Sequence, residues 1–264
     1  MTVRWDPETY LRFADERIRP FHELLARVDA DPRRIVDLGC GPGQSTPILL
    51  ARWPDASVAG VDSSPQMVER ARESDPDGRI DYVLDDLREW RPDAPVDLLV
   101  SAATFQWVPG HLDLLPVLAD SVAPDGTFAF TVPGNFDAPN HVLLRELAGR
   151  EPYAPHVQDV DRPAAHDAAT YLAALSRPRW SVDAWETTYL HVLQGADPVL
   201  RWMVGTGARP VLQALPDDLR ARFEADYAAA LRRAYPPAPY GTVVPFRRIF
   251  AVATRVGAVS QAGQ

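Results

Sequence analysis

The sequence contains no lysine, so all 27 of its basic residues are arginine. Enzymes that form a Schiff base need a lysine amine, and the Walker phosphate-binding loop needs a lysine after its glycines. Both classes are therefore excluded. Cys40 is the single cysteine, which excludes an internal disulfide and any zinc or iron–sulfur site built from several cysteines. The histidines follow no metal-binding spacing such as HExxH, and we expect no metal.

Long apolar runs are also missing, since no stretch approaches the roughly 18 residues that indicate a transmembrane helix. The first residues do not resemble a signal peptide, and we expect a cytoplasmic protein. The 36 acidic residues give a net charge of -9, which argues against nucleic acid or an anionic membrane as a partner. Hydrophobic residues make up 46% of the chain, and we expect a single domain over residues 1–264.

The middle of the chain alternates short aliphatic runs with segments of helical period, as successive βαβ units do. Continuous apolar runs are typical of parallel strands that are buried on both faces. The expected strands cover residues 33–38, 57–62, 79–84, 96–101 and 126–132. This pattern predicts an α/β fold with a mostly parallel sheet and helices on both faces.

The remaining segments surround an expected ligand-binding core at residues 31–135. Residues 1–30 have helical spacing, and Pro20 marks a break or a new first turn. Residues 180–193 alternate with period two, as an antiparallel strand would, and residues 245–256 form an expected last strand. Residues 195–240 are mostly of helical period, and we predict that this insertion is a helical cap that closes over a substrate.

Three glycines at alternate positions, Gly39, Gly41 and Gly43, follow the first expected strand and precede a helix. Glycine permits a positive φ and lets a ligand approach the backbone. In an open parallel sheet, ligands bind beyond the carboxyl ends of the strands, beside such a loop. A dinucleotide-binding loop would have its last glycine where Gln44 stands, so the spacing argues against a bound pyrophosphate.

Acidic residues stand at the ends of three consecutive expected strands. Asp37 is in the first strand, Asp62 closes the second, and the pair Asp85 and Asp86 closes the third. The carboxylate that follows the second strand is placed to accept bonds from ribose hydroxyls. An acidic crevice favours a ligand that combines positive charge with ribose and adenine. S-adenosylmethionine, with its ammonium and sulfonium groups, fits that description.

The segments DLGCGPGQST, GVDSSPQMV and VLDDL resemble, in order and spacing, the motifs of class I, Rossmann-like S-adenosylmethionine-dependent methyltransferases. The resemblance implies that Asp37 and the Gly39–Gly43 loop hold the methionine part, and that Asp62 binds the ribose hydroxyls. It also implies that Met67 and Asp86 with Leu87 lie at the adenine. The implied cofactor site comprises Asp37, Gly39, Cys40, Gly41, Gly43, Asp62, Ser63, Met67, Asp86 and Leu87.

Further segments, at 5–25, 102–111, 132–141, 185–191, 206–212 and 246–250, resemble the family of trans-aconitate 2-methyltransferases. Ala102 departs from the family, which often has Asn there. The resemblance implies methyl transfer to a carboxylate of trans-aconitate, giving a monomethyl ester and S-adenosylhomocysteine. Because a carboxylate is already ionised near pH 7, we expect no catalytic acid or base and assign catalysis to proximity and orientation.

A small polycarboxylic acid needs cationic partners, and paired arginine–carboxylate bonds are the natural means. The candidates are Arg17, Arg19, Arg209, Arg247 and Arg248, of which we favour Arg209 and Arg248. Tyr10, Trp107 and Tyr189 combine an aromatic ring with a polar tip and are expected to close the pocket or bond the substrate.

Two alternatives remain open at this stage. The first is a methyltransferase of the same fold that acts on another small molecule or on a carrier-bound malonyl thioester. The second is a catalytically silent module that binds the cofactor, because a fold alone does not establish a function. The sequence does not indicate an oligomeric state.

Overall fold

The structure, a computed structural model, describes residues 14–257, with side chains from Ile18 onward. The described chain divides into two compact units. We call the first the sheet unit; it comprises residues 17–132, 166–186 and the chain from residue 249. The second, which we call the helical unit, comprises residues 133–165 and 187–248.

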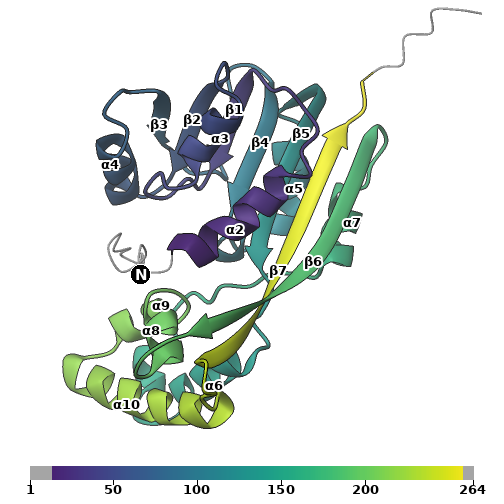
Figure 1. Cartoon of the computed structure of the whole chain (residues 1–264). Coiled ribbons are helices and arrows are strands. Elements are labelled where there is room, and N and C mark those ends of the chain that lie inside the picture. The colour runs from purple at the N-terminus through teal and green to yellow at the C-terminus, as the bar shows by residue number, and fades with distance from the viewer. Residues whose placement is uncertain (1–13, 258–264) are drawn as a thin grey trace, which may run out of the picture. The chain divides into compact units, whose positions relative to one another are not determined.

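The strands form one seven-stranded sheet in the order β3-β2-β1-β4-β5-β7-β6 (Figure 1). The strands β1 to β5 pair in parallel, and the last strand, β7, is antiparallel to its neighbours (Figure 1). This arrangement confirms the predicted Rossmann-like fold class. The bounds are β1 Arg34–Leu38, β2 Ser57–Asp62, β3 Ile80–Leu84, β4 Val96–Ala102, β5 Val122–Pro133, β6 Trp180–Leu193 and β7 Thr242–Arg255.

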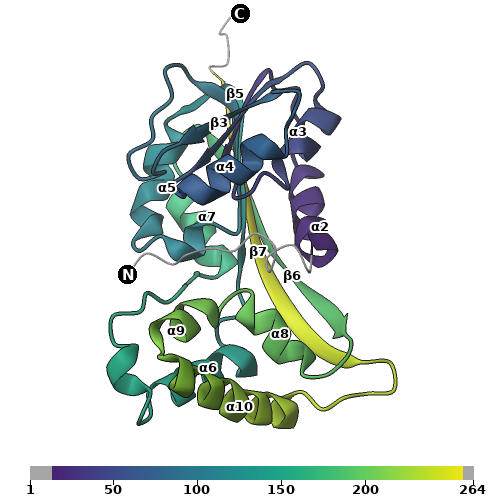
Figure 2. The ribbon, with the colours of Figure 1, turned by 90° about the vertical axis from the view of Figure 1, so that its left-hand side faces the viewer.

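Helices cover both faces of the sheet unit, as expected. Figure 2 shows α2 and α3 on one face and α5 and α7 on the other. The buried strands between them have almost no exposed side chains; in β4, Leu98, Leu99 and Val100 are fully buried. The helices are α2 Ala14–Leu25, α3 Thr46–Arg52, α4 Pro65–Glu73, α5 His111–Ala119 and α7 Ala168–Leu175, with a short 3-10 helix, η1, at Phe105–Trp107.

The amino-terminal helix corrects one expectation, because Pro20 lies inside α2 and does not break it. Proline removes one backbone donor from a helix, which normally favours a kink or an end. Here the residues after it, Phe21, Leu24 and Leu25, are each 1% exposed or less. Burial of this apolar face outweighs the missing hydrogen bond and keeps the turn helical.

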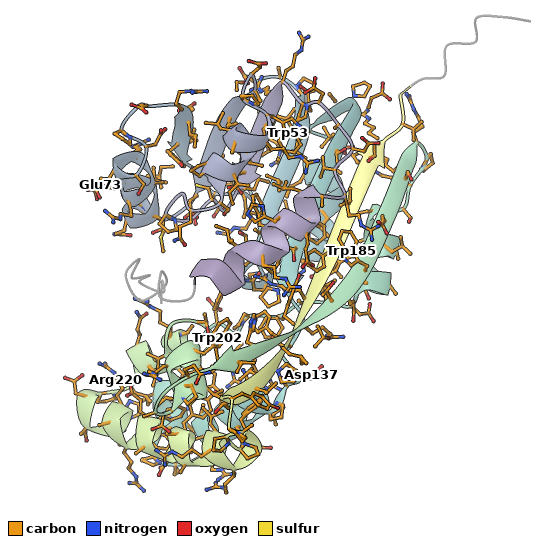
Figure 3. The ribbon with its side chains drawn as sticks, viewed as in Figure 1. Trp53, Glu73, Asp137, Trp185, Trp202 and Arg220 are labelled. Atoms are coloured by element: carbon orange, nitrogen blue, oxygen red, sulfur yellow. The ribbon has the colours of Figure 1, made fainter. Side chains whose placement is uncertain are left out.

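The helical unit has its own hydrophobic core. It contains α6 Pro139–Ala148, α8 Pro198–Val204, α9 Arg209–Ala214 and α10 Asp217–Ala234, with a 3-10 helix, η2, at Ala154–His156. Trp202, labelled in Figure 3, packs in this core with residues of all four helices, such as Leu144, Leu212 and Phe223. The segment 195–240 therefore shares its core with α6, and its closing over a substrate stays a prediction. Within residues 14–257, no helix is long and apolar enough to cross a membrane.

Candidate functional site

The glycine loop is anchored to the end of the neighbouring strand. The backbone N–H groups of Gly39 and Cys40 donate to the carbonyl of Val61, at 2.7 and 3.1 Å. Gly39, Gly41 and Gly43 all have positive φ, at 73, 57 and 78°. A Cβ on Gly39 would lie 2.2 Å from the Thr104 side chain, whereas one on Gly41 would meet no atom within 4 Å. Packing therefore requires the first glycine, while the second borders open space that a ligand can enter.

Asp62 fastens the loop to the start of α4. Its Oδ2 accepts from the Gly41 N–H and its Oδ1 from the Ser64 N–H, each at 2.9 Å. Burial raises the pKa of Asp62, and these two N–H donors oppose the shift. Because each carboxylate oxygen can accept more than one bond, both keep a lone pair for the two hydroxyls of a ribose. The neighbouring Ser63 is exposed.

Asp37 lies behind the loop and is only 1% exposed. Its Oδ2 accepts a 2.8 Å bond from the Thr46 hydroxyl, at the first turn of α3. Burial raises the pKa of Asp37 to about 7, the Thr46 bond lowers it, and the charge of Asp62 raises it. Burial likewise raises the pKa of the Cys40 thiol, so Cys40 is an inert part of the loop. Asp37 is thus placed to support the loop from below.

Two of the residues predicted to contact adenine, Asp86 and Leu87, follow the end of β3, and the third, Met67, lies in α4. The Asp86 carboxylate accepts from the Arg88 side chain, with Nε at 2.9 Å from Oδ1, and from the Arg88 N–H at 2.9 Å. The Arg88 bonds hold the pKa of Asp86 below its usual value, so it is ionised. Leu87 and Met67 are buried at 9% and 5% exposure. Their contact with adenine stays a prediction.

The predicted substrate residues divide between the two units. Trp107 lies in η1, just after β4, in the sheet unit and is half-buried. Tyr189, Arg209 and Arg248 belong to the helical unit. Tyr10 lies outside the described residues, and only the backbone of Arg17 is described, in α2.

Tyr189 and Arg248 meet one aromatic cluster in the helical unit. The Tyr189 ring stacks on His191 with centroids 6.2 Å apart, and His191 lies 5.5 Å from the Phe246 ring. The Arg248 guanidinium carbon lies 5.6 Å from that Phe246 ring. Tyr189 and Arg248 are 4% and 5% exposed. A buried arginine that packs against aromatic rings is well suited to bind an anion such as a carboxylate.

Arg209 lies elsewhere in the helical unit, at the first residue of α9, and is half-buried. The turn before it packs closely, since a Cβ on Gly207 would lie 2.7 Å from the His141 ring. Burial lowers the pKa of His141 to about 4, so this imidazole is neutral at pH 7. The turn that precedes Arg209 therefore packs against an uncharged histidine.

Three residues at these sites were not predicted from the sequence: Thr46, Thr104 and Asn135. Thr46 bonds Asp37, and Thr104 packs on Gly39 and donates to its carbonyl at 3.3 Å. Asn135 lies in a segment, 132–141, that carries the family resemblance, but its type alone gave no reason to single it out. Only its buried surroundings do so.

Gly39→Ala and Gly41→Ala form a matched pair with opposite expected results. Alanine at 39 must displace Thr104, so we expect the melting temperature to fall by several degrees. Alanine at 41 costs only the strain of its positive φ, about 1–2 kcal/mol, but its methyl group fills the ligand's approach, so ligand affinity should fall at least about 10-fold. Thermal melts and equilibrium binding measure both. Equal effects of the two variants on melting and binding would contradict this account.

Asp37 predicts a pH-dependent stability. Its pKa rises on folding from 3.8 to about 7, so the stability from its proton is fully present below pH 3.8 and is lost as the pH rises through 7. Asp37→Asn keeps an acceptor for Thr46 but has no proton to lose. The variant should match the parent near pH 4 and exceed it by a few kcal/mol, about 4 at most, at pH 8. Urea unfolding at both pH values measures this; a difference that does not change with pH would refute it.

The comparisons with known proteins agree with this geometry. A family model described as a methyltransferase domain matches residues 10–169. A trans-aconitate 2-methyltransferase of Streptomyces avermitilis is 52% identical over 258 residues, covering 94% of this chain and 96% of the relative. One of Mycobacterium tuberculosis is 44% identical, covering 98% and 99%.

A solved structure shares the fold at low identity. The plantazolicin methyltransferase BpumL, in complex with SAH, is 13% identical with a TM-score of 0.50, covering 94% of this chain and 85% of that one. The parallel sheet, the glycine loop and the carboxylate at the end of β2 agree with the family that these relatives indicate. The chain belongs to the trans-aconitate 2-methyltransferases, a family with the methyltransferase domain.

Proposed function

We propose that this protein transfers a methyl group from S-adenosylmethionine to a carboxylate of trans-aconitate, giving the monomethyl ester and S-adenosylhomocysteine. The observation that carries the proposal is the Asp62 carboxylate bonded to the Gly41 and Ser64 N–H groups, beside open space at Gly41. Family membership, through the names of the relatives, supplies the acid.

The residues of the sheet unit fit this cofactor. The space at Gly41 lets a ligand approach the backbone, and Asp62 retains lone pairs for two hydroxyls. Asp62 and Asp86 supply negative charge, which suits a ligand with ammonium and sulfonium groups. The cofactor, when bound, supplies an activated methyl group on sulfur.

The residues of the helical unit are suited to an anionic acid. Arg248 is buried against Phe246, and Arg209 is the first residue of α9. Their role is to neutralise and orient carboxylates through paired N–H donors. A carboxylate nucleophile is ionised near pH 7, so orientation and exclusion of water replace a general base. Tyr10, Arg17, Trp107 and Tyr189 are further proposed substrate-binding residues.

Methyl transfer from labelled S-adenosylmethionine tests the proposal with trans-aconitate, cis-aconitate, citrate, isocitrate and itaconate as acceptors. We expect ester formation on trans-aconitate with the highest kcat/KM of the panel. A malonyl thioester on a carrier protein serves as the comparison. Preference for the thioester would assign the protein to another substrate class, and cofactor binding without turnover of any acceptor would indicate a silent module.

A further inference from the structure

Asn135 is a buried polar side chain of the helical unit whose amide is unusual in its hydrogen bonding. It is 5% exposed, and neither its Oδ1 nor its Nδ2 has a hydrogen-bond partner in the part of the chain that the structure describes. Buried amides are normally paired, because a donor or acceptor removed from water without a partner destabilises the fold. A buried, unpaired amide at a residue with no evident structural role indicates that a ligand supplies its partners.

The backbone around Asn135 is held by hydrogen bonds on both sides. The Gly134 N–H donates to the Arg247 carbonyl at 2.8 Å, and Arg247 Nε donates back to the Gly134 carbonyl at 2.6 Å. On the other side, Arg145 donates to the Phe136 carbonyl at 2.7 Å. The Asn135 carbonyl itself accepts from the Ala138 N–H at 2.9 Å. These bonds fix the backbone that carries the unpaired amide.

Asn140 provides an internal comparison. It lies five residues further along, at the start of α6, and is completely buried. Its Oδ1 accepts from the Tyr235 hydroxyl at 2.9 Å, and its Nδ2 donates to the Met203 sulfur at 3.0 Å. The same unit therefore satisfies one buried asparagine completely and leaves the other without a partner.

The position of Asn135 indicates what its partner is. Gly134 and Arg247 are joined by two hydrogen bonds. Asn135 follows Gly134 in the chain, and Arg248 follows Arg247. Arg248 is buried and is proposed to hold the substrate acid. A neutral amide next to this contact offers an N–H donor without adding a charge that would repel a carboxylate.

We infer, resting on the proposed function, that Asn135 is a substrate-binding residue whose Nδ2 donates a hydrogen bond to a carboxylate of trans-aconitate. Its Oδ1 accepts from a guanidinium N–H that holds the same carboxylate, since an arginine has several donors. Asn135 thereby selects acids that carry a carboxylate at this position. Acids without that group leave the buried amide unsatisfied and bind more weakly.

The test compares Asn135→Asp and Asn135→Leu with the parent. Aspartate has the same shape but turns a donor into an anion, so the KM for trans-aconitate should rise about 10- to 100-fold at pH 8. Leucine removes a buried unpaired amide, so it should raise the melting temperature by a few degrees and still raise KM.

Dicarboxylates that each lack one carboxylate of trans-aconitate identify the contact. Measured as competitive inhibitors, at least one should bind the parent and Asn135→Asp within about 3-fold, because the repelled group is absent. The matched control, Asn140→Leu, should lower the melting temperature and leave KM within about 2-fold, because it breaks bonds that only support the fold.

The outcomes are separable. An unchanged KM in the Asn135 variants overturns the inference, as does a rise in KM that is equal for every acid. Asn135→Ser, a smaller change, gives the same KM comparison if the first two variants do not fold. Failure of the parent to methylate trans-aconitate overturns the proposed function instead, which is measured before any variant.

Discussion

Arg248→Gln is expected to lower kcat/KM for trans-aconitate by about 100-fold or more. Arg248 is 5% exposed and lies 5.6 Å from the Phe246 ring, so a carboxylate bound to it is largely removed from water. Glutamine keeps a polar end group on a shorter side chain and loses the charge and the forked donors. Initial rates over a range of trans-aconitate concentrations measure the effect, which should fall mainly on KM.

Two further variants serve as controls for this prediction. Arg248→Lys keeps the charge without the fork and should lose less activity than Arg248→Gln. Arg222→Gln changes an exposed arginine of α10 in the same unit, 65% exposed, and should stay within about 2-fold of the parent. If Arg248→Gln folds, binds S-adenosylmethionine and keeps KM for trans-aconitate within about 3-fold of the parent, Arg248 does not bind the substrate.

Asp62→Ala is expected to weaken S-adenosylmethionine binding by about 100-fold. The change removes the acceptor for the Gly41 and Ser64 N–H groups and the proposed acceptor for two ribose hydroxyls. Equilibrium dialysis or calorimetry measures the Kd. The effect on the melting temperature without cofactor should be smaller than the effect on cofactor affinity. Both N–H groups can form hydrogen bonds with water in the open space near Gly41.

Asp81→Ala is the matched control for Asp62→Ala. Asp81 is an exposed aspartate on β3, the strand that pairs with β2, and its loss removes the same charge. The Kd of Asp81→Ala should stay within about 2-fold of the parent. If both variants weaken binding equally, the net charge of this unit matters and the specific Asp62 contacts do not.

The two predictions depend on opposite charges in the two units. The sheet unit places Asp37 and Asp62 at the ends of adjacent parallel strands, which suits a cationic donor. The helical unit buries Arg248 in a protein of net charge -9, which concentrates positive charge where an acid is proposed to bind. Local burial, rather than the overall charge, decides which ligand each unit favours.

The sequence by itself determined the parallel sheet and the glycine loop. Continuous apolar runs define strands buried on both faces, and β6 was predicted with its observed bounds, Trp180–Leu193, from alternation alone. Glycine at positions 39, 41 and 43 permits the positive φ that all three residues adopt. These features depend on neighbours in the sequence, so local patterns are sufficient.

Other features were decided by contacts between distant residues. Pro20 remains helical because Phe21, Leu24 and Leu25 are buried, which no local propensity indicates. The 2.2 Å approach that forbids a side chain at Gly39 comes from Thr104, 65 residues away. The core of the helical unit likewise joins α6 to the three helices that follow β6.

Burial also separates residues that look alike in the sequence. Asp37 and Asp62 are both strand-end carboxylates, yet the first accepts from Thr46 in the interior and the second accepts from the loop beside open space. Asn135 and Asn140 are the same residue type five positions apart, and only the fold gives one of them partners. The sequence shows which polar groups are present; the tertiary structure decides which remain unpaired, because hydrogen-bond partners come from distant segments.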